Sequence, residues 1–205
     1  MTVHTGARAM GSPSTRAEEV LLTAANLFCE LGYEATTVEE ISTATGLTKG
    51  GLYHYIKSKE DVLYKIMCYA MEGMKEQVVK PVAAIADPEE QLRELVKRHV
   101  GEIAVAKGVL TILSEETQSL TPEHREEILR YKREHYHFVR DILQRLRKQG
   151  RLRKEVDTTV ATFSILGMIL FFARWYRSEG RTSAERIGEE IAALALNSVL
   201  RPADE

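Results

Sequence analysis

Cysteine is scarce in this sequence of 205 residues, which contains only Cys29 and Cys68. Their spacing matches no metal-binding or redox motif, and both fall in stretches of helical apolar periodicity. They are therefore expected to be buried free thiols in a reducing cytoplasm. The sequence also lacks a nucleophile–base constellation, a phosphate-binding glycine loop and a paired-cysteine zinc site. It supports neither an enzyme nor a bound metal or cofactor.

Long apolar runs are also missing. The longest uncharged run, residues 158–173, is sixteen residues long and includes four hydroxyl side chains. That is short for a membrane span, so a buried helix is expected and no membrane partner. Residues 1–14 lack the apolar stretch of a signal peptide, and their small, polar composition predicts a disordered tail.

Neither positive nor negative side chains predominate, since the net charge is −2. Residues 1–60 carry five cationic and seven acidic side chains. A nucleic-acid-binding protein with this balance would depend on a few well-placed cations and on helix N-termini, because phosphate binding needs local positive charge.

No segment has the period-two pattern of a strand, and the sequence predicts an all-α protein of about nine helices. Its apolar periodicity and start and stop signals place these helices at about 16–31, 38–45, 49–55, 59–80, 88–107, 109–119, 122–149, 157–178 and 183–200. We expect a tail over 1–14, a three-helix helix-turn-helix domain over 15–60, and an effector-binding and dimerisation domain over 61–205.

The helix-turn-helix prediction depends on residues 37–61. Thr37 and Glu40 form a capping box, Gly46 suits a left-handed helix end, and Thr48 suits the next N-cap. Cap, glycine turn and cap at this spacing are typical of a helix-turn-helix.

This region resembles the N-terminal DNA-binding domain of TetR-family transcriptional regulators. The chain differs mildly from the family pattern at Tyr55 or Ile56, where the family often has Phe. The resemblance covers roughly 45 residues and is carried by Phe28, Gly32, Tyr33, Thr37, Ile41, Ala44, Gly46, Leu47, Thr48, Gly51, Leu52, Tyr53, Tyr55, Lys57, Ser58, Lys59 and Glu60.

The resemblance implies how the domain meets operator DNA. The first turn of the recognition helix would approach the major groove, with Lys49 at base edges or phosphate, while Tyr53 and His54 would touch the backbone. Lys59 and Thr37 would each bind a further phosphate. The alternative, in which Tyr53 is a core residue and Lys59 a solvated charge, is less favoured, and Tyr55 is expected in the core. The predicted DNA-binding residues are Thr37, Thr48, Lys49, Gly50, Gly51, Tyr53, His54 and Lys59.

Residues 115–200 resemble the ligand-binding domain of a TetR subgroup that includes repressors of fatty-acid, sterol and aromatic-acid breakdown. The resemblance is carried by residues 166–168, 174–177 and 180–183, and it implies an acyl-CoA thioester as the small-molecule effector. Core packing is the alternative for the apolar candidates. The candidate effector-binding residues are Met71, Met74, Leu113, Glu116, Tyr131, His135, Phe171, Arg174 and Trp175.

Two charged features keep alternatives open. Arg174 would either anchor an anionic ligand or pair with a carboxylate across a dimer interface. The basic stretch 145–154 is interpreted as a solvated helix end that meets the helix dipole, with the phosphates of a CoA-type effector as the second interpretation.

We therefore expect a homodimeric repressor that a small effector releases from its operator. The last two helices would form the dimer interface through stripes of apolar or small residues: Val160, Phe163 and Gly167, with Ile187, Ile191 and Leu194. One alternative is a helical carrier or enzyme with a vestigial helix-turn-helix. Another is a structural DNA-binding protein without an effector.

Overall fold

The structure, a computed structural model, describes residues 15–202, apart from the side chains of Lys107 and residues 113–115. The predicted disordered tail over 1–14 lies outside the described residues.

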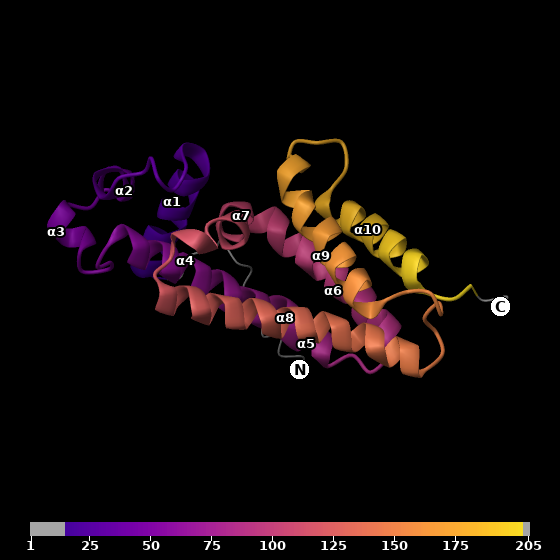
Figure 1. Cartoon of the computed structure of the whole chain (residues 1–205). Helices are drawn as coiled ribbons and strands as arrows, with labels where there is room; N and C mark the ends of the chain where they lie inside the picture. The colour runs from indigo at the N-terminus through magenta and orange to yellow at the C-terminus, as the bar shows by residue number, and fades with distance from the viewer. Residues whose placement is uncertain (1–14, 203–205) are drawn as a thin grey trace, which may run out of the picture. The chain divides into compact units, whose positions relative to one another are not determined.

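The described residues are almost entirely helical, which confirms the predicted all-α class, and two of them form an isolated antiparallel bridge, Leu152 with Leu200. Helix α4, the π-helical segment η1 and α5 follow one another without a break, so residues 15–202 hold nine helices besides the short 3₁₀ turn η2. The elements are α1 (Arg16–Leu31), α2 (Val38–Thr45), α3 (Lys49–Leu52), α4 (Lys59–Met74), η1 (Lys75–Val79), α5 (Lys80–Ala83), α6 (Pro88–Val105), α7 (Lys107–Glu115), η2 (Thr117–Ser119), α8 (Pro122–Lys148), α9 (Thr158–Trp175) and α10 (Ala184–Val199) (Figure 1).

The chain divides into two compact units. Among the described residues, the first contains 15–73 and 106–131, and the second contains 74–105 and 132–202. The predicted boundary at residue 60 stays a prediction about function, since the units of close contact each combine two stretches of the chain.

The first unit packs α1 against α2 and α7. Its interior is built from apolar faces at helical spacing, including the fully buried Val20, Ala24, Ile41, Leu52 and Ile66. The ring of Phe28 meets Tyr33 edge to face at 5.1 Å between centroids. Together these contacts hold the short α2 and α3 in place.

The second unit is organised around α6, which packs against both α9 and α10 (Figure 1). The side chains of Leu92, Val96, Ile142, Phe172 and Ala195 are buried in its core. Helix α8 ends at Lys148 before Gly150, whose φ of 71° is the left-handed conformation that glycine adopts without strain.

Pro81 does not end the fourth predicted helix, which continues to Ala83. Lys80 N–H donates to the Lys75 carbonyl, five residues back, in the π pattern. This shifted bonding directly precedes Pro81, which has no N–H to donate, so the helix accommodates the proline instead of stopping.

Three other helix limits differ from the sequence prediction. The interruption after α6 falls at Ala106 instead of Gly108. Helix α9 stops at Trp175, and the N-cap of α10 is Ser183, which accepts a hydrogen bond from Arg186 N–H, instead of Thr182. Adjacent hydroxyl residues offer nearly equal caps, so sequence alone does not choose between them.

Candidate DNA-binding and effector sites

Helix α2 begins at the predicted capping box. Thr37 Oγ1 accepts a hydrogen bond from Glu40 N–H at 3.2 Å, and Thr37 N–H donates to Glu40 Oε2 at 2.7 Å. The bond from Thr37 N–H, and then a second bond that the Thr37 hydroxyl donates to Glu40 Oε2 at 2.9 Å, hold the pKa of the Glu40 carboxyl below its usual value. At the other end, Gly46 has a φ of 65°, a conformation that costs a side-chain-bearing residue about 1 kcal/mol or more. Both ends of α2 match the prediction.

Helix α3 is shorter than predicted. Thr48 caps it by accepting from Gly51 N–H at 3.1 Å, and the α-helix covers Lys49–Leu52 before the chain continues in turns to Tyr55. Two glycines in four residues give this segment low intrinsic helix propensity. The buried Leu52 and Ile56 attach it to the core of the first unit.

Most predicted DNA-binding residues lie at the surface of this segment. Gly51 is half-buried, and a Cβ there would come within 3.2 Å of Thr48 Oγ1, so glycine allows the cap to form. Tyr55 is half-buried, as expected of a packing residue. The exposed members are Thr37, Thr48, Lys49, Gly50, Tyr53 and His54.

Lys59 has partners within the first unit. Its Nζ donates to the carbonyls of Tyr33 at 3.0 Å and Glu34 at 3.2 Å, and lies 4.4 Å from the centroid of the Tyr33 ring. An ammonium has three donors. The sequence analysis assigned this cation to phosphate, whereas the structure gives it a second role in fixing the loop after α1. Its phosphate contact stays a prediction.

A polar cluster that was not predicted from the sequence joins α4 to the start of α8 within the first unit. His124 stacks on Tyr64 with ring centroids 3.7 Å apart, and its Nδ1 lies 2.9 Å from Glu60 Oε1. Tyr64 donates to Glu127 Oε2 at 2.6 Å, and this bond, with burial, raises the pKa of the Tyr64 hydroxyl. The four residues share no short sequence motif.

The candidate effector residues are distributed over both units. In the first unit Met71 is buried, Tyr131 is half-buried, and Glu116 accepts from Ser119 Oγ at 3.1 Å. In the second, Met74 is buried, whereas Phe171, Arg174 and Trp175 are exposed on α9. Leu113 lies outside the described side chains. Ligand contact by these residues stays a prediction.

His135, the remaining candidate, faces His99 inside the second unit. The rings meet edge to face with centroids 5.1 Å apart. His99 Nδ1 and His135 Nε2 are enclosed and have no hydrogen-bond partner among the described residues. Burial lowers the pKa of His135 to about 4, and burial followed by the charge of a protonated His135 holds the pKa of His99 well below its ordinary value. Both imidazoles are therefore neutral near pH 7.

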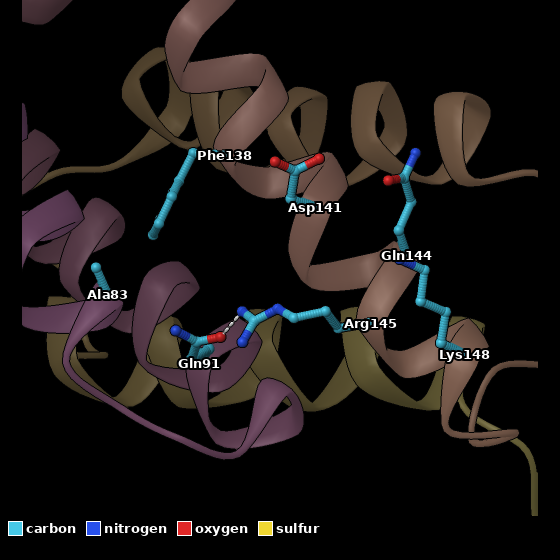
Figure 2. A pocket seen from close by; sticks show the side chains of 7 residues that line it. All are labelled: Ala83, Gln91, Phe138, Asp141, Gln144, Arg145 and Lys148. Carbon is cyan, nitrogen blue, oxygen red and sulfur yellow. Dashed lines mark hydrogen bonds between the residues drawn. The ribbon is translucent and has the colours of Figure 1, made fainter.

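A polar groove of about 530 Å³ lies on the second unit (Figure 2). It is lined by Ala83 of α5, Gln91 of α6, and Phe138, Asp141, Gln144, Arg145 and Lys148 of α8. None of these residues was predicted as a site by itself, although Arg145 and Lys148 belong to the basic stretch 145–154. Their positions in sequence gave no signal that they share a groove.

Helix α9 presents an apolar face to solvent. Val160 and Phe163 are each 63% exposed and Phe171 65% exposed, at spacings that place them on one side of the helix with Gly167. The sequence analysis expected a buried helix, but only the opposite side, which includes Ile165, Ile169 and Phe172, is buried. On α10, Leu194 is exposed, whereas Ile187 is buried within the unit.

By length and composition α9 would also pass as a membrane-crossing helix, with 28% of its residues buried. Its buried side packs on α6, and its exposed side is a stripe rather than a full circumference. Such a one-sided stripe is typical of a protein interface. Among residues 15–202, with the side chains noted above set aside, no group of three or more His, Cys, Asp or Glu is arranged to hold a metal ion.

Two family models match the chain. Residues 20–66 match the model described as bacterial regulatory proteins, tetR family. Residues 86–199, more than half of the sequence, match the model described as tetracyclin repressor-like, C-terminal domain.

Individual relatives cover nearly the whole chain. The HTH-type transcriptional repressor KstR2 of Mycobacterium tuberculosis is 27% identical over 95% of this chain and 98% of its own length. Its solved structure superposes with a TM-score of 0.87 over 95% of this chain and 100% of that one, at 26% identity. The crystal structure of AibR in complex with isovaleryl coenzyme A and operator DNA is 37% identical, with a TM-score of 0.80 and coverage of 88% and 97%.

Proposed function

Because the chain belongs to the TetR family of DNA-binding transcriptional regulators, we propose that it is a homodimeric cytoplasmic repressor that an acyl-CoA thioester releases from its operator. The observation that carries this proposal is the α2–Gly46–α3 unit with its exposed recognition turn. Each subunit would place α3 in a major groove of a pseudo-palindromic operator.

Few groups would make the DNA contacts. Thr48, Gly50 and Gly51 leave the backbone of α3 accessible, so Lys49 can reach base edges or phosphate. Tyr53, His54 and Thr37, all exposed, would contact the sugar-phosphate backbone and fix the register of the protein on DNA. The third donor of Lys59 remains for a phosphate near the start of α4.

The apolar stripe of α9 supports the dimer. Helix α9 exposes Val160, Phe163 and Phe171 on one side. A second copy of the chain would cover this apolar face. Helix α10 would contribute Leu194 to a four-helix interface, while Ile187 serves the core of its own unit. Dimerisation would set the distance between the two recognition helices.

The effector class is inferred from the relatives. AibR, which was crystallised in complex with isovaleryl coenzyme A and operator DNA, is 37% identical to this chain in the aligned region. The continuous helix formed by α4, η1 and α5 begins near Lys59 and ends at Ala83, which lines the polar groove. A ligand that moves the end of this helix would thereby bias its DNA-proximal start, which couples the two binding events.

Binding to the DNA that flanks the gene of this protein tests the proposal. We expect fluorescence anisotropy to show specific binding that falls at least about tenfold with a saturating acyl-CoA, tested over a panel that includes isovaleryl-CoA. The variant Lys49→Ala with His54→Ala should lose operator binding and keep acyl-CoA binding in calorimetry. A panel in which every saturating thioester leaves operator affinity unchanged would contradict the effector proposal.

A further inference from the structure

The polar groove of the second unit is suited to a charged ligand with an aromatic ring. Arg145 and Lys148 supply two positive charges and Asp141 one negative charge, while Gln91 and Gln144 supply carboxamides. Phe138 and Ala83 supply apolar surface on which a ring can pack. Phosphate groups would find two cations and amide donors.

The groove differs from one end to the other (Figure 2). Phe138 and Ala83 lie at one end and Lys148 at the other, with Arg145 and Gln91 below the space between them. Phe138 and Lys148 are ten residues apart on α8, which corresponds to about 15 Å along the helix axis. A ligand that used both ends would carry its ring and its phosphates at separate positions.

Arg145 is held in place before any ligand binds. Its Nη2 donates to Gln91 Oε1, and Gln91 Nε2 donates to the Val82 carbonyl at 2.9 Å. Gln91 is only 2% exposed, so this anchor is built into the core and fixes the plane of the guanidinium. The bond to Gln91 uses one of the five N–H donors of Arg145. A pre-organised guanidinium loses less conformational entropy when it binds phosphate.

The other arginines of the basic stretch have structural partners instead. Arg147 donates to the Val156 carbonyl, Arg151 pairs with Asp87 and Glu89, and Arg153 donates to the Leu200 carbonyl at 2.8 Å. The pKa of the Asp87 carboxyl lies below its usual value, chiefly because Asp87 accepts a hydrogen bond from Arg151. Arg145 and Lys148 are therefore the two cations of this stretch that line the groove.

We propose that this groove binds the adenosine 3′-phosphate 5′-diphosphate end of the acyl-CoA effector. Phe138 would contact the adenine ring, Asp141 would accept from its exocyclic amino group, and Arg145 with Lys148 would bind the phosphates. This inference rests on the proposed function for the identity of the ligand. It separates recognition of the nucleotide from recognition of the acyl group, which would fall to other residues.

The test compares ligands that contain one end or both ends of the effector. Titration calorimetry of the full chain would use isovaleryl-CoA, adenosine 3′,5′-bisphosphate, and the N-acetylcysteamine thioester of the same acid, which lacks the nucleotide. Lys148→Glu should weaken the first two by about tenfold or more, through reversal of an exposed charge next to phosphate, and leave the third unchanged. Lys154→Glu, an exposed lysine of the same stretch outside the groove, is the matched control and should change none of them more than about twofold.

The possible outcomes separate the two proposals. The inference is overturned if the bisphosphate fails to bind the wild-type protein at millimolar concentration, or binds Lys148→Glu and the wild type equally. If the bisphosphate and acyl-CoA bind and Lys148→Glu weakens them, while no acyl-CoA lowers operator affinity, the groove assignment stands and the proposed release mechanism fails. Arg145→Lys provides a second variant, which keeps the charge and loses the fixed planar donor set.

Discussion

His99 and His135 are two histidines whose environment determines how they respond to pH. Both are neutral in the folded protein near pH 7 because burial disfavours the imidazolium, and no hydrogen-bond acceptor among the described residues offsets that cost at the enclosed nitrogens. His135 as a residue is half-buried, and its Nε2 is enclosed. The pair is too small for a metal site and instead makes the second unit sensitive to acid.

This pair predicts a loss of stability in mild acid. The pKa of His135 falls from an ordinary 6.5 to about 4 on folding, so between these values the unfolded chain binds a proton that the folded chain does not. The contribution is fully present above pH 6.5 and is lost as the pH falls, by about 2 to 3 kcal/mol at pH 4.5 for His135 alone. Urea unfolding at several pH values between 7.5 and 4.5 would measure how steeply the free energy of unfolding falls with pH.

His135→Leu should flatten this slope, whereas His137→Asn, at an exposed position two residues away, should retain it. An equal pH dependence of the free energy of unfolding in the wild type and His135→Leu would contradict the prediction. Comparing the pH dependence of the two proteins separates the titration of His135 from any change in stability that the leucine causes equally at every pH.

The N-cap residue of α2, Thr37, combines a structural and a proposed functional role. The Thr37 hydroxyl accepts from Glu40 N–H and also donates to Glu40 Oε2 at 2.9 Å. A phosphate contact would require this hydroxyl to exchange its carboxylate partner for a phosphate oxygen. Substitutions that keep the cap but change the charge can separate the two roles.

Thr37→Asp is expected to keep the stability of the protein and lose operator binding. Aspartate caps helices as well as threonine, so the free energy of unfolding should stay within about 0.5 kcal/mol of the wild type. A negative charge facing phosphate should weaken operator binding about tenfold or more in anisotropy. Thr37→Ser should preserve both properties, and Thr37→Ala should lose about 1 kcal/mol of stability. Wild-type operator affinity in Thr37→Asp would remove Thr37 from the DNA interface.

The limits of α2 could be predicted from sequence because every determinant lies within a few residues. Thr37, Glu40 and Gly46 each fix the backbone next to them, and the observed helix ends where these signals place it. Helix α3 was predicted too long, since its apolar pattern continued to Tyr55 while its glycines weakened the helix itself. Lys59 was assigned only to phosphate, because its carbonyl partners Tyr33 and Glu34 lie more than twenty residues before it.

Across the whole molecule, the sequence predicted the family and the all-α fold but not the polar groove. Its lining comes from Ala83, Gln91 and about three turns of α8, which only the packed second unit brings together. The interface predicted on α9 consisted of Val160, Phe163 and Gly167, whereas Phe171 was predicted to contact the effector. All four lie in the segment that was expected to form a buried helix. Composition does not reveal whether an apolar face packs within its own chain or on a partner.

The exposed stripe of α9 leads to a prediction about assembly. Phe163→Glu with Phe171→Glu places two charges on side chains that are 63% and 65% exposed in the single chain, so its fold should persist with unchanged far-ultraviolet circular dichroism. In the proposed dimer the same charges would be buried without partners, and sedimentation should show a monomer. Operator affinity should fall at least about tenfold, because a monomer contacts one half-site. Val105→Glu, a 56% exposed apolar residue on α6, should remain dimeric. A double variant that still sediments as a dimer and binds operator normally would assign the interface to another face.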